Sequence, residues 1–337
     1  MLVIPTLEIS SIKKNETHLA LNNMVQDTQI SERIKLSWSD TVELVGSSSV
    51  DEVGLRERVA SLATRSIKRD SKLQALNMVT SMCDLTTLEG QDTDGKVSQM
   101  VAKAISPDPN DNSVPSVAAV CVYPGLVEIA KKETSGSKVL VASVSSYFPS
   151  GQAPLESKIH DTKYAISNGA DEIDIVINRK AFLEGDDRRV FDEISTLKEV
   201  CGDVHLKTIL EVGELGTYDN IRKASMIAMS AGSDFIKTST GKISEGASRE
   251  ACCIMAKAAQ DFRKATGSIV GIKVAGGIKD AKDSIRYLVL IKEEIGEDWL
   301  DPKYFRFGAS SLLNDVLRQI KKIKTGAYQD SYYFPRG

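Results

Sequence analysis

Three ionisable side chains stand inside hydrophobic, β-branched segments, where charged residues are uncommon. Lys237 lies in DFIKTST, Asp174 in EIDIVIN and Lys273 in IVGIKVAGG. If each segment is a strand, alternation puts the neighbouring isoleucines and valines on one face and the charged residue on the other. An enclosed carboxylate is costly without cationic company. The three segments therefore predict a cluster in which a carboxylate and two amines meet, a set suited to proton transfer and to attack on a carbonyl group.

The spacing places these groups at nearly one depth. Asp174 and Lys237 each follow a helix-ending glycine by five residues, and Lys273 follows Gly267 by six. Neighbouring strands lie about 4.8 Å apart. Two ammonium groups about 5 Å apart, at an effective dielectric constant near 20, repel by roughly 3 kcal/mol. We expect this repulsion to lower the pKa of Lys237 and to leave part of it as a free, nucleophilic amine at neutral pH, while Asp174 stays ionised.

Each of these residues also has a structural interpretation. A lone lysine near TSTGK is commonly a surface or helix-start residue, and Asp174 could be only the partner of a barrel lysine. The convergence of three ionisable groups on three segments favours catalysis over these readings. Lys207 and Glu211 share one face of another predicted strand, and for them we favour a structural ion pair.

Eight predicted strands supply the frame for these residues. Most of them start roughly 30 to 40 residues apart, and they alternate with helical patterns, which is typical of a (β/α)8 (TIM) barrel of the α/β class. A doubly wound open sheet is the alternative. The strand segments are SMCDLTTL, AAVCVYP, KVLVASVSSYF, EIDIVIN, HLKTILEVG, DFIKTST, IVGIKVAGG and FRFGASS.

The flanks of this repeat differ from it. Residues 1–70 are predicted to be an N-terminal extension, partly helical, with a helix near 51–67. Residues 71–326 are assigned to the barrel and 327–337 to a C-terminal tail. The last barrel helix follows Ser311 and is closed by Gly326; its hydrophobic face consists of Leu312, Leu313, Val316, Leu317, Ile320 and Ile323.

Glycine-rich turns follow the last three predicted strands and suggest an anion site. Glycines let backbone N–H groups converge on an anion, and the loops after strands seven and eight are the usual phosphate site of such barrels. Ser310 or Ser311 could cap the helix that follows, whose N-terminus favours phosphate. The turns are Thr240-Gly241-Lys242, Ala275-Gly276-Gly277 and Phe307-Gly308-Ala309-Ser310-Ser311.

Composition limits the partners. The net charge is −3, the pI is near 5.8, and no strong basic patch appears, so we expect no nucleic-acid partner. No run approaches the roughly 20 apolar residues of a membrane span. The five cysteines show no CxxC spacing, which favours a reducing, cytoplasmic location. The three histidines are far apart in the sequence, and we predict no metal. A homo-oligomer is possible.

Several of these motifs together resemble the deoxyribose-phosphate aldolase family of class I aldolases. They are DLTTL, CVYP, EIDIVIN, FIKTSTGK, GIKVAGGIK and FRFGASSLL, and the likeness covers about residues 76–326. The long N-terminal extension is more similar to eukaryotic-type members. The resemblance implies reversible cleavage of 2-deoxy-D-ribose 5-phosphate, a small phosphorylated sugar, to D-glyceraldehyde 3-phosphate and the short aldehyde acetaldehyde, with no cofactor.

The resemblance also implies roles for individual residues. Lys237 would form the Schiff base, Lys273 would be the neighbouring cation, and Asp174 would orient water and relay protons. Asp84 and Cys121 match positions that line the family's pocket. Lys279 stands where the family often has arginine, and it lacks the bidentate fork of arginine. The substrate-binding and phosphate-binding matches are Thr240, Gly241, Lys242, Gly276, Gly277, Lys279, Gly308, Ser310 and Ser311.

Two other functions stay open on the sequence alone. A pyridoxal-phosphate-dependent barrel enzyme also needs a lysine and a phosphate cup. A non-catalytic barrel that binds sugar phosphates would need the cup alone.

Overall fold

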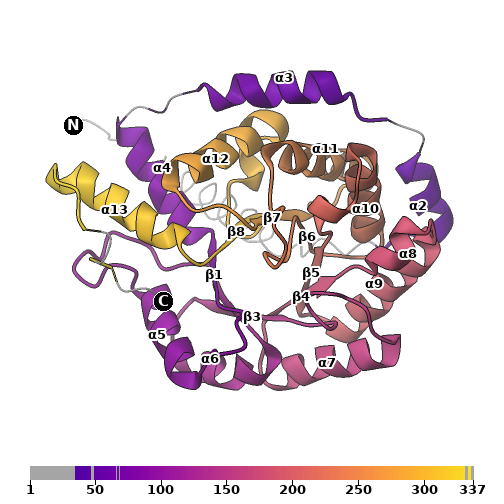
Figure 1. Cartoon of the computed structure of the whole chain (residues 1–337), viewed down its shortest axis with the longest axis horizontal. Helices are drawn as coiled ribbons and strands as arrows, with labels where there is room; N and C mark the ends of the chain where they lie inside the picture. Colours follow the sequence, from indigo (N-terminus) through magenta and orange to yellow (C-terminus); the bar gives the residue numbers. More distant parts are fainter. Residues whose placement is uncertain (1–34, 47–48, 66, 68, 331–332, 335–337) are drawn as a thin grey trace, which may run out of the picture. The chain divides into compact units, whose positions relative to one another are not determined.

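Eight short parallel strands pair in chain order, and the eighth also pairs with the first, which closes the sheet into a barrel (Figure 1). The computed structural model describes residues 35–46, 49–65, 67, 69–330 and 333–334. The predicted (β/α)8 barrel is confirmed, and the β1–β8 pairing excludes an open sheet. The strands are β1 (Cys83–Thr86), β2 (Ala119–Val122), β3 (Leu140–Val144), β4 (Glu172–Val176), β5 (His205–Ile209), β6 (Phe235–Lys237), β7 (Gly271–Ala275) and β8 (Phe305–Ala309).

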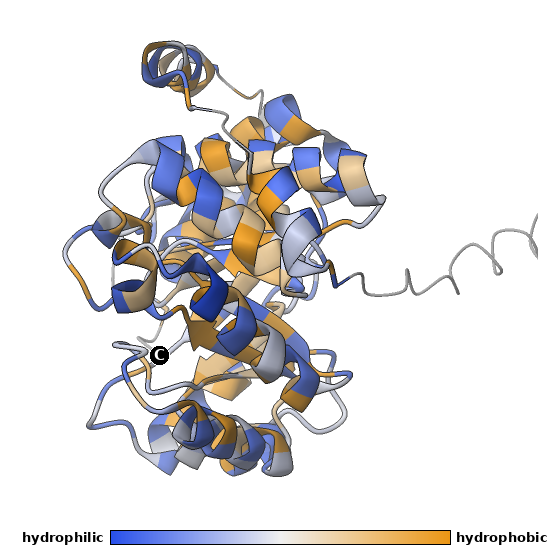
Figure 2. Cartoon of the chain, turned by 90° about the vertical axis from the view of Figure 1, so that its right-hand side faces the viewer, coloured by the Kyte–Doolittle hydropathy of each residue, from blue (hydrophilic) through white to orange (hydrophobic). Residues whose placement is uncertain are grey.

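Helices surround the barrel and carry hydrophobic and hydrophilic stripes, whereas the strands inside are largely hydrophobic (Figure 2). This pattern follows from strands that are buried on both faces: one face packs against helices, and the other fills the barrel. The helices of the ring are α4 (Arg69–Ser81), α5 (Asp94–Ile105), α6 (Val127–Glu133), α7 (Leu155–Ser167), α8 (Arg179–Leu183), α9 (Asp187–Cys201), α10 (Tyr218–Ser230), α11 (Arg249–Thr266), α12 (Ala281–Ile295) and α13 (Leu312–Thr325), with short 3-10 turns at Pro124–Leu126, Val212–Glu214 and Glu297–Trp299.

The junctions between helices and strands set the depth of each strand. Gly169, Gly232 and Gly267 have φ values of 101°, 99° and 80°, in the left-handed region that glycine adopts without strain. At two of these junctions, an aspartate two residues after the glycine accepts a hydrogen bond from a backbone amide of the neighbouring strand. Asp171 accepts a hydrogen bond from the Val141 amide at 2.9 Å, and Asp234 accepts one from the Leu206 amide at 2.7 Å. The repeated junction therefore sets where β3 and β5 begin.

The described part of the N-terminal extension is helical and packs on the outside of the barrel. Helix α3 (Glu52–Ala63) confirms the helix predicted near 51–67, and α2 (Trp38–Val45) was not predicted. Leu55, Val59 and Leu62 of α3 are buried in the main hydrophobic core. Arg58 forms an ion pair with Glu294 of α12 at 2.6 Å. Residues 1–34 of the predicted extension lie outside the described residues.

The C-terminal helix α13 matches its prediction. It begins at Leu312 and ends at Gly326, whose φ of 80° gives a left-handed cap, and its predicted hydrophobic face is buried except for the partly buried Ile323. The segment after α13 contacts the rest of the protein: the Gln329 carbonyl accepts a hydrogen bond from Arg318 of α13 at 3.2 Å, and the Phe334 side chain is buried. Within the ranges given above, no helix is long and apolar enough to cross a bilayer.

Candidate active site

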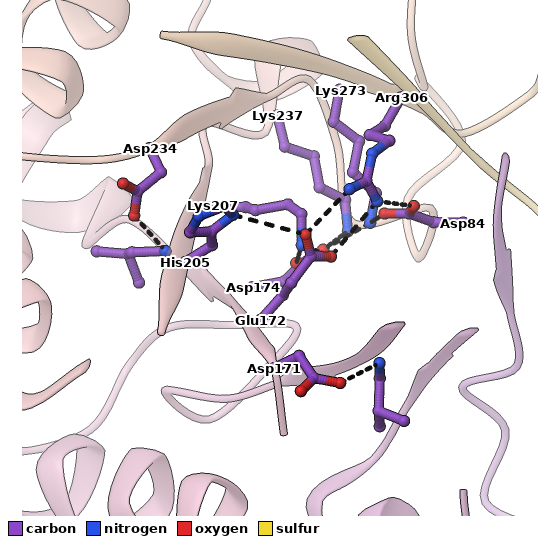
Figure 3. Close-up of polar contacts among 12 residues, drawn as sticks. Asp84, Asp171, Glu172, Asp174, His205, Lys207, Asp234, Lys237, Lys273 and Arg306 are labelled. Carbon is purple, nitrogen blue, oxygen red and sulfur yellow. Dashed lines mark hydrogen bonds and ion pairs between the residues drawn. The ribbon is translucent and has the colours of Figure 1, made fainter. Parts of the chain in front are cut away.

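Lys237, Asp174 and Lys273 meet inside the barrel, as their strand positions predicted (Figure 3). The Nζ atom of Lys237 lies 2.8 Å from Asp174 Oδ2, and that of Lys273 lies 2.9 Å from the same oxygen. All three side chains are almost fully buried. Lys237 and Lys273 are direct partners in the β6–β7 register. One carboxylate oxygen therefore faces two amines in an enclosed site.

Four further charged side chains continue this cluster through the barrel interior (Figure 3). Lys207 Nζ lies 2.5 Å from Glu172 Oε2 and 3.2 Å from Asp174 Oδ1. Arg306 donates hydrogen bonds to Asp84 Oδ1 at 2.6 Å and to Glu172 Oε1 at 3.1 Å. Asp84 Oδ2 in turn lies 2.6 Å from Lys273 Nζ. The seven side chains form one continuous network, which we call the interior charge network: Asp84, Glu172, Asp174, Lys207, Lys237, Lys273 and Arg306.

The predicted ion pair between Lys207 and Glu211 is wrong. Residues four apart on one strand are separated by about 13 Å, whereas Asp174 is the direct neighbour of Lys207 in the β4–β5 register. Glu211 instead accepts a hydrogen bond from Arg179 at 3.1 Å. Pairing across strands therefore decides the partner of Lys207, and spacing along the strand does not.

A ring lies within the same interior and contacts two of its cations. Lys207 Nζ and the Arg306 guanidinium carbon lie 5.9 Å and 5.7 Å from the centroid of the Phe235 ring, within cation–π range. The ring occupies space that a side chain at Gly271 would need, since a Cβ there would lie 2.3 Å from Phe235. Glycine at 271 thus makes room for the ring.

The buried charges move one another's pKa values. Burial would raise the pKa of Asp174, but the ammonium groups of Lys207, Lys237 and Lys273 outweigh burial and hold it well below its usual range. Burial would lower the pKa of Lys273, but Asp174 and Asp84 outweigh it and raise that pKa. Asp174 therefore stays a carboxylate, and Lys273 stays an ammonium.

Lys237 moves in the opposite direction. Burial lowers its pKa, Asp174 acts against burial, and the charge of Lys273 adds to the lowering. The predicted direction is confirmed. The predicted cause is incomplete, because burial contributes more than the repulsion from Lys273, and sequence spacing does not measure burial.

A cavity of about 330 Å³, which Lys237 lines, lies at the carboxyl ends of the strands. Lys237 lines it together with every residue of the predicted phosphate set, so residues from four strand ends converge on one space. Residues after β1 also line it and were not predicted. The lining consists of Thr86, Thr87, Leu88, Glu89, Lys96, Lys237, Thr240, Gly241, Lys242, Ala275, Gly276, Gly277, Ile278, Lys279, Gly308, Ala309, Ser310 and Ser311.

Glycine is required at specific points of this lining. Gly241, Gly276 and Gly277 have φ values of 77°, 87° and 84°, which disfavour other residues. A Cβ at Gly308 would lie 2.9 Å from Ala275 Cβ and 3.1 Å from Lys273 Cε, so glycine allows β8 to approach the amine. These turns line the cavity, and turns of this kind let backbone amides converge on an anion.

The predicted serine cap of α13 is wrong in one respect. Ser311 occupies the N-cap position, but its side chain makes no capping hydrogen bond, and its φ and ψ of −97° and −19° are helical rather than extended. A serine needs an extended backbone to turn its hydroxyl onto the N2 or N3 amide. Ser310 and Ser311 both line the cavity instead.

Glu211 ties the turn after β6 to the rest of the rim. It is fully buried and has a φ of 57°, a conformation that is uncommon for a residue with a side chain. Its carboxylate accepts hydrogen bonds from the Thr240 amide at 3.1 Å and the Thr240 hydroxyl at 2.5 Å. Arg179 reaches the same carboxylate and also the carbonyls of Pro149 and Ser150. Three loops of the rim are thereby joined.

Asp84 and Cys121 lie deeper than the sequence suggested. Both are fully buried, and the cavity wall near β1 begins at Thr86. Burial raises the pKa of Cys121 to about 11, with the Asp174 charge adding to it, so the thiol stays protonated. Arg306, a network residue that sequence reasoning missed, could have been found from its alternation with Phe305 and Phe307 in FRFGASS.

The fold and the site together define a (β/α)8 barrel in which a buried lysine lines a cavity at the carboxyl ends of the strands. A model of the DeoC/LacD family aldolases matches residues 78–318, and the chain belongs to this family. It is 42% identical over 313 residues to the deoxyribose-phosphate aldolases of Homo sapiens and Mus musculus, which covers 90% of this chain and 96% of each relative. The fold is also that of the tetrameric deoxyribose phosphate aldolase from Aeropyrum pernix, with a TM-score of 0.57 and 23% identity over 77% of this chain and all of that one.

Proposed function

We propose that the protein is a class I aldolase that reversibly cleaves 2-deoxy-D-ribose 5-phosphate to D-glyceraldehyde 3-phosphate and acetaldehyde. The observation that carries this proposal is the place of Lys237. Lys237 lines the same cavity as the glycine turns, and its Nζ atom lies 2.8 Å from Asp174 Oδ2. The family and the names of the human and mouse relatives support the same reaction.

The reaction begins at the free amine of Lys237. Its lone pair attacks C1 of the open-chain sugar, and the carbonyl oxygen gains a proton to give a carbinolamine. Loss of that hydroxyl as water leaves a protonated imine, an electron sink for the next step. In our proposal Asp174 holds the water and moves the protons, since its low pKa keeps it ionised as an acceptor.

Carbon–carbon cleavage follows from the imine. The C3 hydroxyl gives up its proton, the C2–C3 bond breaks, and its electron pair moves into a C1–C2 double bond. D-glyceraldehyde 3-phosphate leaves, and an enamine remains on Lys237. Protonation at C2 and addition of water then release acetaldehyde and restore the amine. Lys273, held as an ammonium by Asp174 and Asp84, supplies a fixed positive charge beside this sequence.

The other end of the substrate would occupy the turns. We assign its phosphate to Gly241, Lys242, Gly276, Gly277, Gly308, Ser310 and Ser311, with Thr240 and Lys279 at the same wall. Asp84 and Cys121 are assigned to the support of the site from below. A phosphate bound by the Lys242 ammonium and several backbone amides would hold the substrate in one orientation, with its C1 atom at the Lys237 amine.

One trapping experiment tests this function. The protein is incubated with acetaldehyde or with 2-deoxy-D-ribose 5-phosphate, reduced with borohydride and digested for mass spectrometry. We expect an irreversible adduct on Lys237, and none there in Lys237→Arg. An unmodified Lys237 during turnover would reject the proposal. A visible absorbance band from bound pyridoxal phosphate, or sugar phosphate binding without cleavage, would support one of the two alternatives.

We also propose a cytoplasmic location and self-association. Cys83, Cys121, Cys252 and Cys253 are free and buried, which supports a reducing compartment. Imaging of the tagged protein tests the first proposal, and sedimentation equilibrium tests the second. A membrane-enclosed location or a monomer at all concentrations would contradict them.

A further inference from the structure

The interior charge network holds more positive than negative groups. It contains four cationic side chains, Lys207, Lys237, Lys273 and Arg306, and three carboxylates, Asp84, Glu172 and Asp174. All seven are buried. With every group ionised, the network therefore carries one uncompensated positive charge in a region where an unpaired charge is costly.

Neighbouring charged groups do not remove this surplus. His205 Nδ1 lies 3.9 Å from Glu172 Oε1, but its side chain is 47% exposed, so solvent reaches it. At the cavity, Lys242 is paired with Glu89 at 2.8 Å, and Lys96 is paired with Asp92 at 2.6 Å. Lys279 also lines the cavity and would add positive charge. The thiol of Cys121 is neutral. The surplus is thus a property of the interior itself.

The contacts decide which cation gives up a proton. Lys207 contacts Glu172 and Asp174, and Lys273 contacts Asp84 and Asp174. Arg306 contacts two carboxylates as well, and a guanidinium does not deprotonate in proteins. Within the described residues, Lys237 has one carboxylate partner, and it is the network member that lines the cavity. Neutralising Lys237 therefore costs the fewest contacts and restores charge balance.

Asp174 shows how Lys207 takes part. Its Oδ1 atom faces Lys207 at 3.2 Å, and its Oδ2 atom faces Lys237 and Lys273. One carboxylate thus serves three ammonium groups. We propose that Lys207 is a positioning residue whose charge leaves the network one carboxylate short and thereby keeps Lys237 as an amine. This inference rests on the proposed role of Lys237 as the nucleophile, and it adds a third lysine to the groups that control it.

The test measures the protonation of Lys237 directly. Competitive labelling with a trace of acetic anhydride at a series of pH values, read by mass spectrometry against the exposed Lys282, gives the pKa of Lys237 without any aldol chemistry. In Lys207→Met the remaining charges balance with Lys237 protonated. We expect the pKa of Lys237 and the acid limb of kcat/KM to move upward by about 1 pH unit or more. An unchanged pKa would overturn the proposal.

A double variant separates charge balance from local disturbance. Lys207→Met with Glu172→Gln removes one charge of each sign, so the surplus returns, and we expect the pKa of Lys237 to move back toward that of the parent. A pKa that stays at the value of the single variant would contradict the charge count. Lys158→Met is the matched control, because Lys158 is equally buried and pairs with Glu193 at 2.7 Å outside the barrel interior. It should leave the pKa of Lys237 unchanged.

Further measurements distinguish a failure of the Lys207 proposal from a variant that does not fold and from a failure of the proposed function. If Lys207→Met does not fold, Glu172→Gln alone increases the surplus and should move the pKa of Lys237 downward; no movement would count against the proposal. Borohydride trapping on the parent protein reports the proposed function independently. A trapped adduct with an unmoved pKa in the variants would leave the aldolase standing and reject the role of Lys207.

Discussion

At the scale of single residues, the chemistry depends on Asp174, which holds three ammonium groups with two oxygen atoms. Its charge raises the pKa of both Lys207 and Lys273 against the effect of burial, together with Glu172 for Lys207 and Asp84 for Lys273. Lys237 differs from them because burial acts on it with the least compensation. A small difference in the number of partners therefore separates two lysines that stay cations from Lys237, the proposed nucleophile.

We expect Asp174→Asn to damage both folding and activity. Among the described residues, removing the charge takes from Lys237 its carboxylate partner and from Lys207 and Lys273 one of two partners. Breaking a buried pair in this way typically costs about 3–5 kcal/mol. The change also removes the proposed proton acceptor, which typically costs at least about 100-fold in rate. Urea unfolding and steady-state turnover measure the two effects. Asp298→Asn, which breaks an exposed pair with Arg263, is the control and should change neither. A stable, active Asp174→Asn would contradict the assignment of Asp174.

Acid should unfold the protein through the same carboxylates. In the folded state Lys207, Lys237 and Lys273 overcome burial and lower the pKa of Asp174 below 3.8, and Lys207 and Arg306 overcome it to lower that of Glu172 below 4.5. The unfolded chain thus takes up these protons first. Their stabilisation is complete above about pH 5 and is lost as the pH falls through the folded-state values.

Urea unfolding at a series of pH values from neutral to about 3 checks this dependence. We expect the free energy of unfolding to fall with pH, and to fall less steeply in Glu172→Gln, which lacks one of the two titrating groups. A parent protein whose stability does not change over this range would show that the network is not responsible.

At the scale of elements, strands fix the amines and loops fix the opposite end of the site. The register of β4 to β7 brings Asp174, Lys237 and Lys273 together, and strands allow little adjustment. The loops depend on side-chain hydrogen bonds instead. Glu211 holds Thr240 through its amide and its hydroxyl, and Arg179 holds Glu211. Substrate phosphate should therefore sense Glu211 although Glu211 itself does not line the cavity.

We expect Glu211→Gln to raise KM for the sugar phosphate by about tenfold or more, the equivalent of one hydrogen bond to a charged group. The loss should be smaller for non-phosphorylated 2-deoxyribose, because that substrate does not use the Thr240–Lys242 turn. Kinetics with both substrates give the comparison. Glu214→Gln removes an exposed partner of the same Arg179 and serves as the control. Equal losses with both sugars would show that Glu211 does not act through the turn.

At the scale of the whole barrel, α2 and α3 lengthen the hydrophobic core beyond the eight-fold repeat. The Leu36 amide donates a hydrogen bond to the Ser230 carbonyl at the end of α10, and Trp38 contacts Phe191 of α9 edge to face. Arg58 and Arg65 pair with Glu294 and Glu293 of α12. The described extension thus adheres to the outer helices through apolar burial as well as charge.

Leu62→Ala should lower the free energy of unfolding by about 2–5 kcal/mol, as expected for a leucine buried in a packed core. Val53→Ala lies in the same helix at a 69% exposed position and should have little effect. Urea unfolding followed by circular dichroism compares them. If Leu62→Ala behaves like Val53→Ala, α3 does not unfold together with the barrel.

The local sequence pattern predicted most of the fold. Short β-branched runs identified all eight strands, and the left-handed glycines gave the depth of β4, β6 and β7, because both signals depend on residues close in the chain. The same local information found Lys237, Lys273, Asp174 and the glycine turns. It failed for α2, whose 8 residues make only about two helical turns. It also failed for the cap at Ser311, whose backbone angles depend on how β8 meets α13.

The sequence by itself determined which side chains face the barrel interior, since the two-residue period of a strand fixes the face of each one. Only the tertiary structure decided which charges touch. Lys207 pairs with Glu172 and Asp174 of the neighbouring strand β4 rather than with Glu211, which follows its own strand. Arg306 of β8 reaches Glu172 of β4. Closure of the sheet sets these contacts, because it brings strands that are distant in the sequence to within a side chain's length. The surplus positive charge that we propose to act on Lys237 is costly only because that closure buries the network.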